Sequence, residues 1–183
     1  MAKIPGTLAA KADHIIFHFD GNNNDPDDIA AIPVAALLAK AGGVTDKMTF
    51  AYGNNLSEKG MSGRYDKMDK GAALARKVGI DAVSYENNPN AVTNKLVKLL
   101  NSGQKVLMIE GGPMEAAYRA IDKVNPAFHK NLTLVSHSGW NENRDKINIP
   151  GVKEARTWDD LQKDFPKLNM IEIADQNGGY HID

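Results

Sequence analysis

The stretch at residues 18–28, HFDGNNNDPDD, packs four aspartates and three asparagines into eleven positions, directly after the apolar run at 15–17. Neighbouring carboxylates repel one another unless a cation neutralises them. Hard divalent cations such as calcium bind about six to eight oxygen ligands, and clustered aspartates and asparagines can supply several of them. The spacing lacks the rhythm and the closing glutamate of an EF-hand loop. The stretch therefore predicts a different kind of metal site.

A helix start explains part of the same motif. Asp25 can cap a helix whose first residue is Pro26, with Asp27 and Asp28 in the first turn, where acids face the positive end of the helix dipole. That reading accounts for three of the four aspartates. It leaves Asp20 unexplained, because this residue follows an apolar run and precedes the expected helix.

The elements that must position these residues alternate along the chain. Short apolar runs predict strands at 14–19, 48–52, 105–109, 132–136 and 169–173, and a weaker one at 82–85. Helical patterns lie between them at 27–41, 67–78, 90–100, 114–124 and 158–165. Continuous apolar runs suit strands buried on both faces, with helices as crossovers. We expect an α/β, doubly wound, mostly parallel sheet of the Rossmann-like kind.

Polar residues follow most of the expected strands. In such sheets, ligands bind outside the carboxyl ends of the strands, so these segments should share one edge. They are residues 20–28, 53–55, 110–113, 136–143 and 175–179. We therefore expect several oxygen-rich loops to meet at one rim.

Length and composition restrict the class of protein. A chain of 183 residues predicts a single domain, with 1–13 as a flexible N-terminal segment. The net charge of −1 provides no basic field for nucleic acid, and no apolar run approaches a membrane span of about 20 residues. The absence of cysteine excludes thiolate chemistry. Localisation stays open between the cytoplasm and export with a signal peptide absent from this chain.

Four segments in order resemble the nucleoside hydrolase (inosine-uridine preferring) superfamily. IIFHFDGNNNDPDDIAAIPVA is similar to its amino-terminal signature, and MTFAYGNN to its second strand. KVLMIEGGPMEAAYRAI is similar to its strand–Gly–Pro–helix segment, and LTLVSHSGWNEN to its sugar-binding loop. The resemblance covers roughly residues 14–145 and identifies the chain as a short, divergent member.

The resemblance implies a role for each matching residue. Asp20 would hold Ca²⁺ and accept the proton of the attacking water. The further calcium ligands would be Asp28 and the Gly111 carbonyl. The sugar would be bound by Asp27, Asn54, Asn141, Glu142 and Asn143, although the asparagine-rich segments also make ordinary turns.

The chain departs from the family pattern at two places. His18 stands where the family usually has an aspartate, and it can equally be a packed strand histidine. Typical members are longer, and their distal part supplies another aspartate ligand. Here Asp175 is the best substitute, with His181 and Asp183 weaker candidates.

These observations predict a calcium-dependent hydrolase of an N-glycosidic or other glycosidic bond, in which a metal-activated water attacks an anomeric carbon. The alternative is a non-catalytic, metal-dependent sugar-binding protein. A flavodoxin-like phosphate-binding protein is a weaker third reading, because an acidic first loop repels phosphate. The expected partner is a small sugar or nucleoside, and a homo-oligomer stays open.

Overall fold

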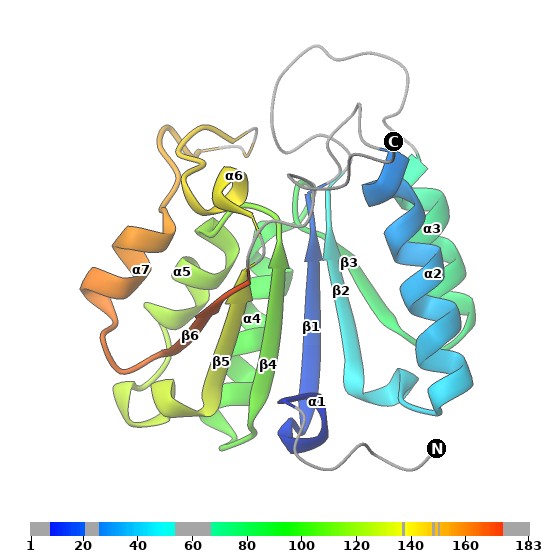
Figure 1. The fold of residues 1–183 in the computed structure, drawn as a ribbon, viewed down its shortest axis with the longest axis horizontal. Helices are drawn as coiled ribbons and strands as arrows, with labels where there is room; N and C mark the ends of the chain where they lie inside the picture. The colour runs from blue at the N-terminus through cyan, green and yellow to red at the C-terminus, as the bar shows by residue number, and fades with distance from the viewer. Residues whose placement is uncertain are drawn as a thin grey trace, which may run out of the picture.

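Six strands form the centre of the molecule. A computed structural model describes residues 8–20, 26–53, 67–136, 138–147, 149 and 151–173. The strands are β1 (His14–Phe19), β2 (Met48–Tyr52), β3 (Asp81–Ser84), β4 (Val106–Gly111), β5 (Leu132–Ser136) and β6 (Asn169–Glu172). They make one sheet in the order β3-β2-β1-β4-β5-β6, and every pairing is parallel (Figure 1). The doubly wound α/β fold predicted from the sequence is confirmed.

Apolar side chains on both faces of the strands explain why the sheet is central. β2 is buried at all five positions, and Ile16 of β1 is fully buried. Three strands have the bounds predicted from the sequence. β4 runs two residues further than predicted, because Gly111 still pairs with Phe19 of β1.

Helices cover the two faces in separate groups. One face packs against α2 (Pro26–Gly42) and α3 (Lys67–Lys77). The other packs against α4 (Pro89–Asn101), α5 (Glu115–Ile121) and α7 (Trp158–Asp164) (Figure 1). Shorter elements are α1 (Leu8–Lys11), α6 (Gly139–Glu142) and the 3-10 turns η1 (Thr45–Lys47) and η2 (Pro126–Asn131).

Local sequence explains where several helices begin. α2 starts at Pro26, as the helix-start motif predicts. Asn88 caps α4 by accepting a hydrogen bond from the amide of Ala91. Thr157 and Asp160 form a capping box at the start of α7.

The helix α2 is apolar on nearly all sides. Its buried side packs closely on α3, since a Cβ on Gly71 would lie 3.2 Å from the Ile32 side chain. Its outer side exposes Val34, Leu37 and Leu38. No helix in the described part of the chain is long and apolar enough to cross a membrane.

Candidate functional site at the carboxyl edge of the sheet

The candidate site lies where β1 and β4 run side by side. From the end of β1 the chain leaves to α2 on one face, and from the end of β4 it leaves to α5 on the other. Connections that diverge in this way leave a crevice between the two strand ends, which is where doubly wound folds bind ligands. On the other side of β1, Gly53 directly after β2 donates a hydrogen bond to the Phe19 carbonyl at 3.2 Å, which holds the ends of β1 and β2 together.

Asp20 and Gly111 lie at the ends of these two neighbouring strands. Asp20 follows β1 directly and is only 4 % exposed, so its carboxylate is buried at the strand end. Gly111 closes β4 opposite Phe19, and a Cβ there would lie 3.0 Å from the carbonyl oxygen of His18. The sheet therefore brings together one predicted carboxylate ligand and the residue predicted to offer a backbone carbonyl.

The remaining predicted ligands and sugar contacts are placed in part. Asp27 is exposed in the first turn of α2, and Asp28 follows it in the same turn. The Asp28 side chain, Asn54 and Asp175 lie outside the described residues. Carboxylates and a carbonyl make an oxygen donor set, which suits a hard cation such as calcium. Within the described ranges no three histidine, aspartate or glutamate side chains are grouped to hold a metal ion.

The predicted sugar-binding segment after β5 separates into inward and outward side chains. Asn141 is buried, and its Oδ1 has no hydrogen-bond partner among the described residues. Asn143 is exposed and donates to the Gly139 carbonyl at 2.8 Å, which closes the turn of α6. Glu142 is half-buried. Trp140 is 60 % exposed and lies under the guanidinium of Arg144, 4.2 Å from the ring centroid. Asn141 is thus the residue of this segment best placed to serve an internal site.

A buried histidine–glutamate pair lies directly below the strand ends. Nδ1 of His18 and Oε2 of Glu110 are 2.6 Å apart, and neither side chain is exposed. Burial raises the pKa of the Glu110 carboxyl, and the neighbouring imidazole opposes that rise. Sequence reasoning named His18 without a partner and did not name Glu110 as a site residue. The available signal was a charged residue at the end of an otherwise apolar strand.

Three polar atoms in this region are buried without partners. They are Nε2 of His18, Oε1 of Glu110 and Oγ of Ser136, none of which has a hydrogen-bond partner in the described part of the chain. Each unpaired buried group costs about 1–3 kcal/mol. Three of them would cancel much of the roughly 5–15 kcal/mol that stabilises a typical domain. Polar atoms from water or a ligand are therefore expected to bind here.

Tyr85 and Glu115 continue the polar cluster toward α5. The Tyr85 ring packs edge-on against His18 with centroids 5.4 Å apart. Burial raises the pKa of Tyr85, reinforced by Glu115 and opposed by Arg119. Glu115 in turn forms an ion pair with Arg119 at 2.9 Å. The first turn of α5 therefore combines with β1 and β4 in one buried polar region.

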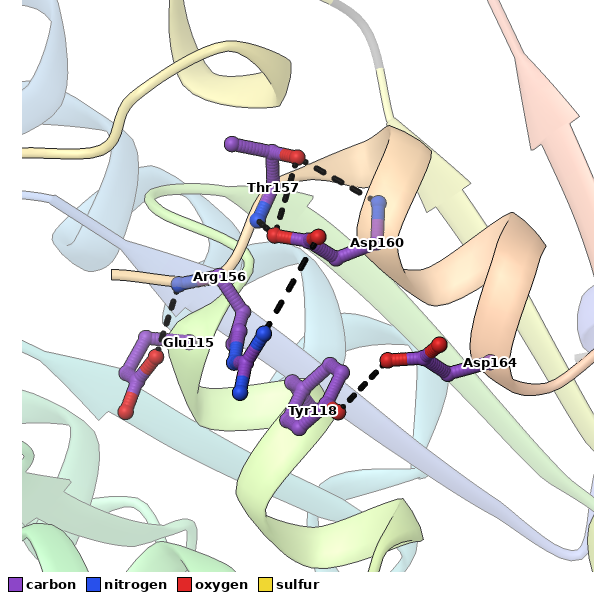
Figure 2. A network of polar contacts seen from close by, with 6 residues as sticks. All are labelled: Glu115, Tyr118, Arg156, Thr157, Asp160 and Asp164. Atoms are coloured by element: carbon purple, nitrogen blue, oxygen red, sulfur yellow. Dashed lines mark hydrogen bonds and ion pairs between the residues drawn. The ribbon is translucent and has the colours of Figure 1, made fainter. Parts of the chain in front are cut away.

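A second network fixes α7 against α5. Glu115 accepts a hydrogen bond from the Arg156 amide at 2.9 Å, and Tyr118 donates to Asp164 at 2.8 Å (Figure 2). The Arg156 guanidinium lies over the Tyr118 ring, 4.8 Å from its centroid. These contacts hold α7 and the residues just before it against α5.

The fold and the candidate site define a doubly wound α/β protein with a polar, partly acidic edge at its topological switch point. The comparisons add no family to this description. No protein-family model matches the chain, and a search of curated proteins finds no significant match.

Proposed function

We propose that this protein is a calcium-dependent hydrolase of a glycosidic bond, acting at the carboxyl ends of β1 and β4. The observation that carries the proposal is the buried carboxylate of Asp20 at the switch point, followed by a helix with Asp27 and Asp28 in its first turn. A helix cap does not require Asp20, whereas a cation with oxygen ligands does.

The proposed calcium ligands are Asp20, Asp28, the Gly111 carbonyl and Asp175. Calcium bound there would neutralise the clustered carboxylates and lower the pKa of a coordinated water. Asp20 would accept the proton of the attacking water as the bond between the anomeric carbon and the leaving group breaks, and the departing group would take up a proton from solvent. The surrounding acids favour a transition state that carries positive charge on the sugar ring. Asn141 holds a sugar hydroxyl from the α6 side, with Asp27, Asn54 and Glu142 as the other proposed sugar contacts. Asn143 closes the turn of α6 instead, because its amide already donates to the Gly139 carbonyl.

Calorimetry followed by a turnover assay tests this proposal. Metal-stripped protein is titrated with calcium, and the loaded protein is then titrated with D-ribose, inosine and uridine. We expect calcium binding, sugar binding that depends on calcium, and release of free ribose from a nucleoside. Binding without release of ribose would support the alternative, a metal-dependent sugar-binding protein.

An exposed acid of α7 provides the control. Asp159→Asn removes a carboxylate far from the switch point and should bind calcium as the parent does. If the parent binds neither calcium nor any of the three ligands, the proposed function is wrong.

A further inference from the structure

His18, Glu110 and Ser136 form one row across three neighbouring strands. The register pairs His18 with Glu110 and Glu110 with Ser136. Side chains at paired positions of neighbouring strands point to the same face of a sheet. All three therefore lie on the face covered by α4, α5 and α7, just below the candidate site.

The row offers hydrogen-bonding atoms that the described chain does not use. His18 is 1 % exposed, and Glu110 and Ser136 are fully buried. Their unpaired atoms are an imidazole nitrogen, a carboxylate oxygen and a hydroxyl. Such a set can both donate and accept hydrogen bonds, which is the combination that hydroxyl groups need.

Gly112 brings the loop after β4 against the His18 ring. A Cβ on Gly112 would lie 2.9 Å from Cε1, 3.1 Å from Nδ1 and 3.2 Å from Nε2 of His18. The nitrogen-bearing edge of the imidazole therefore faces this loop, which borders the crevice at the switch point. Nε2 of His18 therefore lies at the border between this loop and the strand ends.

We propose that the His18–Glu110–Ser136 row is the floor of the ligand site and binds the hydroxyl groups of a neutral sugar or polyol. The proposal rests on the proposed function, because the same site supplies the ligand. The Glu110 carboxylate disfavours an anionic group such as phosphate in the row itself. Glu110 is the positioning residue that orients the imidazole, and Ser136 contacts the ligand beyond it.

Two buried hydroxyls allow a matched test. Ser136 has an unpaired hydroxyl in the row, whereas the hydroxyl of buried Thr93 on α4 donates to the Pro89 carbonyl at 3.1 Å. Ser136→Ala should weaken the binding of D-ribose and uridine about three- to tenfold, with little change in thermal stability. Thr93→Val should lower the melting temperature and leave both ligand affinities unchanged.

Histidine ¹⁵N NMR adds a readout that a purely structural role would not move. The Nε2 resonance of His18, assigned through His18→Gln, should shift when D-ribose is added to the calcium-loaded protein. His129 is the internal control, since its Nε2 is 3.1 Å from the Val124 carbonyl, away from the row. Its resonance should stay in place.

The outcomes separate the two proposals. If the parent binds D-ribose or uridine, and Ser136→Ala binds equally well with no shift at His18, the row is no ligand site, while the sugar binding that the proposed function requires stands. If the parent binds neither compound at tens of millimolar with calcium present, both proposals are overturned.

Discussion

His18 and Glu110 are 92 positions apart in the chain, yet Nδ1 of His18 lies 2.6 Å from Oε2 of Glu110, and both side chains are buried. Parallel pairing of β1 with β4 aligns the two residues across neighbouring strands. Ser136 of β5 continues the row. The sheet therefore carries a buried polar row close to the carboxyl ends of its central strands.

Removing the metal-binding carboxylates should abolish calcium binding. Asp20→Asn and Asp28→Asn each remove a charge as well as an oxygen ligand from a hard cation, so neither variant should show calcium heat in calorimetry. Asp159→Asn is the control. If both variants bind calcium as the parent does, Asp20 and Asp28 are not calcium ligands, and they serve only at the end of β1 and the start of α2.

The two asparagines of the segment after β5 should differ in ligand binding. Asn141 is buried with an unpaired Oδ1, so Asn141→Ala should weaken ribose binding about two- to tenfold. Asn143 already donates to the Gly139 carbonyl, and Asn143→Ala should leave affinity nearly unchanged. Calorimetry on the calcium-loaded variants measures both. Equal losses would place Asn143 in the site as well.

Gly112→Ala should disturb the His18 ring. The added Cβ would lie 2.9 Å from the ring, so the loop or the imidazole must move. We expect the free energy of unfolding, measured with urea, to fall by about 1–3 kcal/mol. Gly139→Ala is the matched control, because its nearest atoms would be 3.9 Å away. Equal stability of the two variants would mean that the loop after β4 does not press on His18.

Loss of the capping box should loosen α7. Thr157→Ala removes the hydroxyl that accepts from the Asp160 amide, and the expected loss is about 1 kcal/mol of unfolding free energy (Figure 2). Calcium affinity should not change. A loss below about 0.3 kcal/mol would show that the Thr157 backbone–Asp160 contact is enough to start the helix.

His14 should make stability fall as the solution becomes acidic. Burial, followed by the Lys95 charge, lowers the pKa of His14 below its ordinary value of 6.5. The unfolded chain then binds a proton that the folded chain resists, so stability is lost as pH falls through about 6.5 and levels off below the folded pKa. His14 can change the free energy of unfolding by at most about 1.4 kcal/mol per pH unit.

Urea unfolding between pH 5 and 8 measures this contribution as the difference between the parent and His14→Gln. Glutamine can keep the 2.9 Å contact with Thr49 but does not titrate in this range. Parallel stability curves for the two proteins would assign the acid sensitivity to other groups.

The sequence alone locates most of the fold. The runs at β1, β2 and β5 are mostly apolar and are bounded by polar residues or glycine, so local composition was enough to predict their ends. Pro26 and the acids after it mark the start of α2 for the same local reason. Element ends that depend on the rest of the fold were harder to predict. β4 extends to Gly111 because this residue pairs with Phe19 of β1. The helix α5 ends at Ile121 rather than at the predicted Val124.

The composition of the site edge was also readable from the sequence, because parallel strands place their carboxyl ends together. That rule pointed to the segments that contain Asp20, Gly111 and Asn141, and the family resemblance then named Gly111 and Asn141 within them. It could not separate Asn141 from Asn143, because the turn of α6 decides which amide faces inward.

Only the tertiary structure pairs His18 with Glu110 and adds Ser136. Each of these residues ends or nearly ends a strand, and nothing local to any of them specifies its neighbour. The strand order does so, by bringing β4 between β1 and β5. That order follows from where the crossover helices can pack, which is a property of the whole chain.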